Sequence, residues 1–360
     1  MKLDFITSII NEAADASPRI PHPEDAIFVS LAEAQKYVGA LKEAIKNPGE
    51  VSIKWDGGIA LIFGYTPAGE FYINDKYMPE GYYAKSPKDW ETYDTTIKKS
   101  RTARPDLYEK IALIWDGLKA DVVAPGTYKG DLMSVGETPL VNGMYEFKPT
   151  TVTYRIPPNS PIGKLVAGKV GVIVVHQKDG APWDGKTGLA NNGNVAVLNP
   201  KAGLSFRLND PVQLSGAATK AVTGPIGKQA EQFLAGLDGV AKAAIQKYFN
   251  HKITGQTNED MVPWLQKNVS GKQYKALVGE NNDGYLAQNE QGLAALTAVW
   301  NAVYVFKVNL ADQLEQQVKG FEQWTAGKQA GEGFVVNTSV GLVKLVNRGV
   351  FGVAHFNKPR

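Results

Sequence analysis

The chain has 360 residues, of which 43% are hydrophobic and 10% aromatic, so it can bury a substantial core, and disorder over most of its length is excluded. At roughly 100–200 residues per domain, this length predicts about two structural units. The 39 Lys and Arg residues nearly balance the 36 Asp and Glu residues, so the net charge of +3 neither requires nor excludes a nucleic-acid partner. The absence of cysteine excludes disulfide scaffolds, thiol nucleophiles and cysteine-ligated metals.

The first fifty residues are helical in pattern. Residues 1–20 carry charges inside their apolar stretch, which indicates a short amphipathic helix rather than a secretory signal. Residues 30–47 predict a longer helix with Ser30 as the N-cap and one apolar face, formed by Leu31, Ala34, Tyr37, Val38, Leu41 and Ile45. No apolar run approaches the roughly 20 residues that span a bilayer, so we expect a cytoplasmic protein without a membrane partner. We also expect a monomer.

From residue 50 to residue 177 the pattern is mainly that of β-strands separated by Gly and Pro turns. Pro105 begins a helix that ends near residue 121 and directs Leu107, Ile111, Ile114 and Leu118 inward. We expect strands at residues 51–65, 70–75, 126–133, 144–148, 151–156 and 169–177. The last of these is almost continuously apolar, as is typical of a strand buried on both faces.

The rest of the chain divides into three segments that differ in composition and apolar pattern. Residues 178–205 are rich in Gly and Asn and predict a long surface loop. Residues 206–326 predict helices, with an apolar stripe that continues as far as Trp324. The final segment predicts a β-hairpin with its turn near Asn337 to Gly341. We therefore expect an α+β body with antiparallel sheets, formed by residues 1–205 and 327–360, that is interrupted by a helical module at residues 206–326.

Two segments are candidates for chemistry, and the first is the phosphate-loop pattern GAPWDGKT, from Gly180 to Thr187. Such a loop needs a strand before it and a helix at its Lys-Thr end, so that backbone amides surround the phosphates. Gly188 and the Asn residues that follow are a poor start for a helix, and Pro182 removes one amide. We therefore favour a Gly-rich surface loop over a phosphate site at Lys186.

The second candidate is the segment Lys54-Trp55-Asp56-Gly57-Gly58, between two predicted strands. A lysine nucleophile must be neutral to attack, so burial, neighbouring cations or a metal must lower its pKa. The glycines would let a nucleotide approach the backbone closely. Taken alone, the pattern is equally compatible with a solvated hairpin tip that carries a lysine and an aspartate.

Later segments of the chain resemble further motifs of one superfamily, and this strengthens the case for the Lys54 segment. Lys54 to Gly58 resembles the first motif of the lysine-adenylating nucleotidyltransferase superfamily, which includes ATP-dependent DNA and RNA ligases and mRNA capping enzymes. The third motif of that superfamily is similar to residues 128–132, the fourth to Glu332-Gly333-Phe334-Val335, and the fifth to residues 342–345. HPEDAIF near residue 22 and FKPTTVTY near residue 147 also resemble segments of phage ligase-like proteins.

The resemblance implies a role for each matching residue. Lys54 would attack the α-phosphate of ATP and form a lysyl-AMP intermediate, beside Asp56 and Gly57. Asp131 would contact the ribose or assist metal binding, Glu332 would bind Mg²⁺ or Mn²⁺, and Lys344 would bind the α-phosphate. An aromatic residue would stack on the adenine, and three residues remain open for this role: Tyr145, Phe147 and Tyr154. His176 fits a structural histidine better than a catalyst.

The resemblance therefore implies an ATP-dependent polynucleotide ligase, with RNA preferred to DNA. Ile59, Ser52 and Val346 replace residues that many DNA ligases and capping enzymes carry, and few residues follow Lys344, so no OB-fold is expected after it. A DNA ligase or capping-type enzyme is one alternative, and a non-catalytic nucleic-acid-binding phage protein is another.

The basic run from Lys98 to Arg104 is a candidate strand-binding patch or a solvated loop. This run or Arg348 would supply the phosphate contacts that are lost where the chain departs from the motifs.

Overall fold

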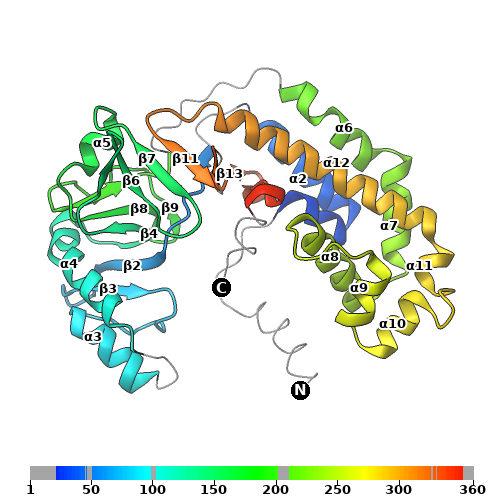
Figure 1. Ribbon diagram of the computed structural model, residues 1–360, viewed down its shortest axis with the longest axis horizontal. Coiled ribbons are helices and arrows are strands. Elements are labelled where there is room, and N and C mark those ends of the chain that lie inside the picture. Colours follow the sequence, from blue (N-terminus) through cyan, green and yellow to red (C-terminus); the bar gives the residue numbers. More distant parts are fainter. Residues whose placement is uncertain are drawn as a thin grey trace.

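The chain folds into a β-rich lobe and a helical lobe, with a small sheet between them (Figure 1). The computed structural model of the protein describes residues 22–44, 46, 51–98, 103–201, 211–325, 327–329 and 331–351. The predicted helix at residues 1–20 lies outside the described residues, as does Ile45 of the predicted apolar face.

The β-rich lobe is built on a six-stranded sheet. The strand order is β10 (Val195–Leu198), β8 (Gly171–Lys178), β4 (Thr127–Val135), β2 (Ile59–Tyr65) and β3 (Phe71–Asp75), and the short β9 (Ala181–Pro182) pairs with β8. Residues 172–175 of β8 are fully buried, as their unbroken apolar run predicts. The helices among the described residues of this lobe are α3 (Pro87–Thr92), η3 (Tyr93–Ile97), α4 (Pro105–Asp121) and α5 (Pro161–Val166). Leu107, Ile111, Ile114 and Leu118 of α4 are buried as predicted.

Two further sheets complete the β structure. A five-stranded sheet has the order β12 (Lys328–Gln329), β11 (Glu322–Thr325), β7 (Thr153–Ile156), β6 (Met144–Phe147) and β5 (Leu140–Val141). A three-stranded sheet has the order β1 (Val51–Ile53), β13 (Phe334–Thr338) and β14 (Gly341–Leu345). Strands β13 and β14 form the hairpin predicted near Asn337 to Gly341.

The helical lobe surrounds the long helix α12 (Glu290–Glu315). Its other members are η1 (Pro23–Phe28), α2 (Leu31–Ala44), α6 (Pro211–Thr223), α7 (Pro225–Ala235), α8 (Gly239–Ile253), α9 (Met261–Asn268), α10 (Gly271–Val278) and α11 (Tyr285–Gln288). Ser30 caps α2 as predicted, because its Oγ accepts a hydrogen bond from the Glu33 amide at 3.0 Å. Helices η1 and α2 pack against α6 and α12, so the N-terminal helices belong to this lobe.

Among the described helices, α12 alone is long and apolar enough to cross a membrane by length and composition. It packs against α6, α7 and η1, and it buries Leu296, Val299, Val303 and Leu310. The core helix of a globular lobe has the same composition, because it is covered by protein on most sides.

A buried ionic network joins η1 to α12 and to the C-terminal segment. Lys307 on α12 forms an ion pair with Glu24 of η1, and both side chains are inaccessible to solvent. Arg348 contacts Glu24 at 3.4 Å and Asp25 at 2.5 Å, and it also donates a hydrogen bond to Asn250. Burial lowers the pKa of Lys307 to about 8, and the Glu24 carboxylate opposes that shift. The network thus fixes the residues that follow β14 against the helical lobe.

The predicted α+β class with antiparallel sheets is confirmed, with three corrections. Strand β10 lies inside the predicted surface loop at 178–205 and pairs with β8 in parallel, so one strand pair is not antiparallel. The predicted helical stripe to Trp324 is wrong beyond Glu315, because Glu322–Thr325 pairs with β7 as a strand. Residues 22–44, which we assigned to the β body, pack in the helical lobe instead.

We predict that Lys307→Met destabilises the protein by about 3–5 kcal/mol, since it leaves the Glu24 carboxylate buried with one cation fewer. The double variant Lys307→Met/Glu24→Gln should recover most of that loss, because the unpaired charge is removed. Urea unfolding measures both free energies of unfolding. Lys228→Met, on the exposed side of α7, is the control and should change stability by less than about 0.5 kcal/mol. Equal stability of Lys307→Met and the wild type would contradict the role of the network.

Candidate functional site

Lys54 lies directly after β1, at one end of the three-stranded sheet. Its amide donates a hydrogen bond to the Gly333 carbonyl at 2.8 Å, which extends the pairing of β1 with β13. Ser52 pairs with Val335, and Val335 pairs with Lys344, so these three residues form one row across the sheet. Because side chains alternate along a strand, Lys54 projects from the same face as Ser52 and therefore from the same face as Lys344.

The Lys54 amine forms an ion pair with the Glu332 carboxylate. The side chains are 23% and 11% exposed, respectively, so the pair lies in a largely desolvated position. Burial raises the pKa of Glu332 above its usual value, and the positive charges of Lys54 and Lys344 oppose that shift. The second carboxylate oxygen of Glu332, Oε2, is buried without a hydrogen-bond partner among the described residues. A buried oxygen of this kind is a candidate ligand for a cation.

Asp131 lies against the glycine that follows Asp56. A Cβ atom at Gly57 would come within 2.2 Å of Asp131 Cβ, so only glycine fits this approach. Asp131 Oδ2 is 3.0 Å from His176 Nε2 on the neighbouring strand β8. The pairing of β4 with β8 skips His176, since Gly130 pairs with Val175 and Lys129 with Gln177. This β-bulge directs the imidazole toward Asp131, and bulges commonly re-aim side chains in this way. His176, which we expected to be only structural, is thus the partner of a predicted site residue.

Asp56 holds the segment between β6 and β7. Its Oδ2 accepts hydrogen bonds from the amides of Thr151 at 2.8 Å and Val152 at 3.2 Å, and also from the Thr150 hydroxyl. The Asp56 amide donates to the Tyr154 hydroxyl at 2.6 Å. These contacts give Asp56 a positioning role that the sequence did not reveal.

A column of aromatic rings supports the site from behind. Trp55 is buried and stacks between Tyr154, at 4.9 Å between centroids, and Phe321, at 4.8 Å. Phe147 stacks on Tyr154 at 5.4 Å. Phe147 and Tyr154 therefore use their faces for packing, and of the three aromatic residues left open for adenine only Tyr145 is partly exposed.

The structure brings the six predicted residues into one region that spans the three-stranded and six-stranded sheets. Lys54, Glu332 and Lys344 share the end of the small sheet, and Asp131 lies against Gly57, three residues after Lys54. The charges of Asp56, Glu332 and Asp131 all act on Tyr154, whose pKa burial raises well above its usual value.

The other candidate cations have partners elsewhere. Arg348 is bound to Asp25 and Asn250, and Arg104 contacts Asp94 at 2.8 Å and Asp75 at 3.4 Å. Residues 99–102 of the predicted basic patch lie outside the described residues.

The segment 180–187 is folded as a local turn. The Asp184 carboxylate accepts hydrogen bonds from the amides of Lys186 and Thr187, both at 2.8 Å, and from the Thr187 hydroxyl. These hydrogen bonds lower the pKa of Asp184 to about 2. Two amides that a phosphate loop would offer to a nucleotide are therefore bound to a carboxylate, and no helix follows. This geometry supports the surface-loop interpretation.

Glu332 and Asp131 are the acidic residues of this region that could share a magnesium ion with the phosphates of a ligand. No group of three or more His, Asp or Glu side chains suited to a metal occurs among the described residues. Mg²⁺ in nucleotide sites is commonly bound by one or two carboxylates together with substrate phosphates and water. Glu332 Oε2 is suited to such a position, with Asp131 as the second carboxylate of the region.

The comparisons with known proteins identify the family. The model of a family of unknown function, DUF6267, matches residues 19–360. The chain belongs to the DUF6267 family. No curated protein matches the chain, and no solved structure matches it. The DUF6267 match covers both lobes and every residue of the candidate site.

We predict that Gly57→Ala disrupts the site, because the new methyl group would overlap Asp131. The expected loss of stability is about 1–3 kcal/mol, as for other overpacked positions. Gly39→Ala is the matched control, since nothing lies within 4 Å of a Cβ atom at this helical position. It should be neutral or stabilise α2 by up to about 1 kcal/mol. Thermal unfolding of both variants tests the packing, and an unchanged midpoint for Gly57→Ala would refute the close approach.

Proposed function

We propose that this protein is an ATP-dependent polynucleotide ligase that forms a covalent lysyl-AMP intermediate at Lys54. The observation that carries the proposal is the ion pair of Lys54 with the buried Glu332, on the same sheet face as Lys344. Three residues from both ends of the chain converge there, in the order that the nucleotidyltransferase resemblance implies. A nucleotidyltransferase fold, with the helical lobe as an accessory, is part of the same proposal.

The arrangement suits the first chemical step. Lys54 Nζ would attack the α-phosphorus of ATP, form a P–N bond and release pyrophosphate. The amine must lose a proton before it attacks, and a metal cation bound at Glu332 would favour that loss together with the charge of Lys344. Lys344 would offset the charge of the α-phosphate, which is the usual contribution of a fixed cation to phosphoryl transfer.

A divalent cation would complete the site. Mg²⁺ or Mn²⁺, held by Glu332 and Asp131, would neutralise phosphate charge. The Asp131–His176 pair and the tight contact with Gly57 would fix the direction of the Asp131 carboxylate.

The helical lobe favours RNA as the substrate. A helical accessory unit beside the catalytic body is closer to phage RNA ligases than to DNA ligases or capping enzymes, which carry an OB-fold. The described residues form no β-barrel, and α2 packs on β13 of the site sheet. Transfer of AMP to a 5′-phosphate and attack by a 3′-hydroxyl would follow adenylation. A DNA ligase or capping-type enzyme remains the alternative within this class.

We predict that incubation with α-labelled ATP and Mg²⁺ gives a labelled covalent adduct that Lys54→Ala abolishes. Glu332→Gln should slow its formation by about 10²–10³-fold, since the variant keeps the shape of the side chain and loses its charge. Lys186→Ala is the control and should form the adduct at the rate of the wild type. An adduct that survives in Lys54→Ala, or no adduct at all with ATP or GTP, would overturn the proposal. Salt-sensitive nucleic-acid binding without an adduct would favour a non-catalytic binding protein instead.

We further predict that RNA ends are joined at least about tenfold faster than the same DNA ends. The measurement compares single-turnover sealing of matched RNA and DNA strands that carry one 5′-phosphate and one 3′-hydroxyl. Replacing ATP with GTP should abolish sealing and distinguishes a ligase from a capping-type enzyme. Faster sealing of nicked DNA would contradict the preference for RNA and leave the adenylation step intact.

A further inference from the structure

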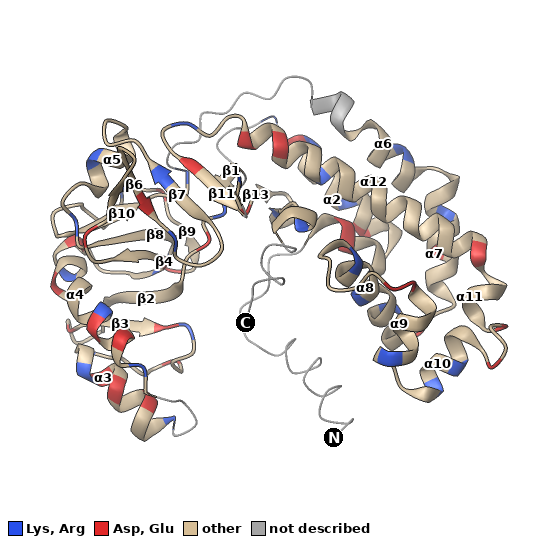
Figure 2. Ribbon diagram, in the orientation of Figure 1, with Lys and Arg blue, Asp and Glu red and all other residues tan. Residues whose placement is uncertain are grey.

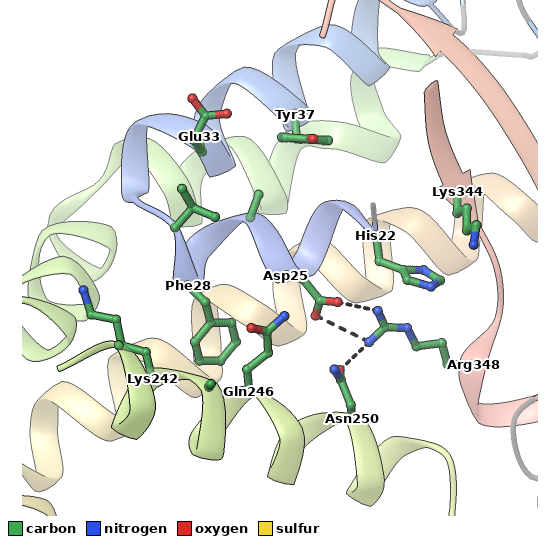
Figure 3. A pocket seen from close by; sticks show the side chains of 14 residues that line it. His22, Asp25, Phe28, Glu33, Tyr37, Lys242, Gln246, Asn250, Lys344 and Arg348 are labelled. Atoms are coloured by element: carbon green, nitrogen blue, oxygen red, sulfur yellow. Dashed lines mark hydrogen bonds and ion pairs between the residues drawn. The ribbon is translucent and has the colours of Figure 1, made fainter. Parts of the chain in front are cut away.

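A cavity of about 760 Å³ lies between η1 and α2 on one side, α8 on another, and the segment from Lys344 to Arg348 (Figure 3). Cavities of several hundred cubic ångströms are the usual size for sites that take a nucleotide or another small molecule. None of the six predicted site residues except Lys344 lines it. The cavity therefore belongs mainly to the helical lobe and meets the candidate site at a single residue.

The middle of the cavity is aromatic and carries amides. Phe28 from η1 lies beside Gln246 and Asn250, which contribute side-chain amides from α8, and Tyr37 of α2 lies on the opposite side of η1 (Figure 3). Stacking on aromatic rings is the common way in which proteins hold an unpaired base, and it contributes about 1–3 kcal/mol per base. Amide groups can hydrogen-bond the edge of that base. This part of the cavity fits a nucleobase.

Each end of the cavity carries a lysine. Lys344 lies at one end, beside His22 and Arg348, and Lys242 lies at the other (Figure 3). The two acidic residues of the lining have cationic partners: Asp25 is bound to Arg348, and Glu33 forms an ion pair with Lys36. Lys242 forms no ion pair with any described residue, and it is one of three lysines on α8, where Figure 2 colours the ribbon blue at Lys and Arg.

The end of the cavity that carries Lys344 lies on the sheet face from which Lys54 projects. Burial lowers the pKa of His22 well below its usual value, and the charges of Arg348, Lys307, Lys344 and Lys54 lower it further. Lys344 faces this cavity and also acts on Glu332, so one lysine is shared by the two sites.

We propose that this cavity binds the phosphorylated 5′ end of the polynucleotide to be joined. The terminal phosphate would lie at Lys344, the first base between Phe28 and the amides of Gln246 and Asn250, and the next phosphate at Lys242. The assignment rests on the proposed ligase function, because it places a 5′-phosphate beside the adenylated lysine. In that step an oxygen of the 5′-phosphate bonds to the phosphorus of AMP, the P–N bond to Lys54 breaks, and the amine recovers a proton.

The test measures binding of fluorescent RNA tetranucleotides in the absence of ATP, so that no chemical step contributes. Each protein is titrated with a 5′-phosphorylated and a 5′-hydroxyl oligonucleotide at several salt concentrations. The wild type should bind the phosphorylated oligonucleotide about tenfold more tightly. Lys242→Glu should weaken both oligonucleotides by about tenfold and reduce the salt slope by about one, because one phosphate contact is lost. Lys344→Met should instead remove the preference for the 5′-phosphate.

The matched control is Lys228→Glu, the same charge change on the exposed side of α7, and it should bind both oligonucleotides as the wild type does. Equal weakening by Lys228→Glu and Lys242→Glu, or a 5′-phosphate preference that persists in Lys344→Met, would overturn the assignment. If the labelled adduct forms at Lys54 and the cavity variants bind normally, the cavity is wrong and the ligase function stands. If the cavity variants lose binding and no adduct forms, the cavity binds nucleic acid and the ligase function is wrong.

Discussion

The pairing of β1 with β13 is the contact on which the candidate site depends. It joins segments far apart in the chain, since the Ser52 hydroxyl donates to the Val335 carbonyl across 283 residues at 3.2 Å. This pairing brings the lysine after β1 next to the glutamate before β13, and the hairpin to β14 adds the second lysine. Without it, Lys54 and Glu332 would belong to separate parts of the molecule.

A second long-range contact fixes the helical lobe to the same sheet. Glu24 and Lys307 are also 283 residues apart, and Arg348, which follows β14, joins their pair. A buried ion pair contributes little net stability, but loss of one partner is costly, so such a pair constrains which segments meet. The position of the cavity between η1, α8 and Lys344 follows from this constraint.

The local pattern of the sequence was sufficient for most elements. Apolar periodicity predicted α2 and α4, with their inward faces, and turn residues predicted the terminal hairpin. Strand β10 was missed because its four apolar residues follow a Gly- and Asn-rich segment, and its pairing with β8 is set by tertiary contacts. Residues Glu322–Thr325 mix polar and apolar side chains much as the preceding helix does. Their pairing with β7 is therefore the feature that identifies them as a strand.

For the candidate site, the sequence predicted residues but not their contacts. The order of motifs predicted Lys54, Asp131, Glu332 and Lys344 as site residues, and the fold brings these four residues into one region. The bulge that turns His176 toward Asp131 depends on strand register, which one sequence does not specify. Lys307 did leave a signal, because it interrupts the apolar stripe of α12, but its partner in η1 required the tertiary structure.

The central claim is that Lys54 is the nucleophile of a nucleotidyl transfer. Peptide mapping by mass spectrometry, after incubation of the protein with ATP and Mg²⁺, tests it most directly. The account predicts one adenylyl group on the peptide that contains Lys54 and none on the peptides that contain Lys186 or Lys344. An adenylyl group on another residue, or an unmodified Lys54 peptide under conditions in which ATP is consumed, would contradict it.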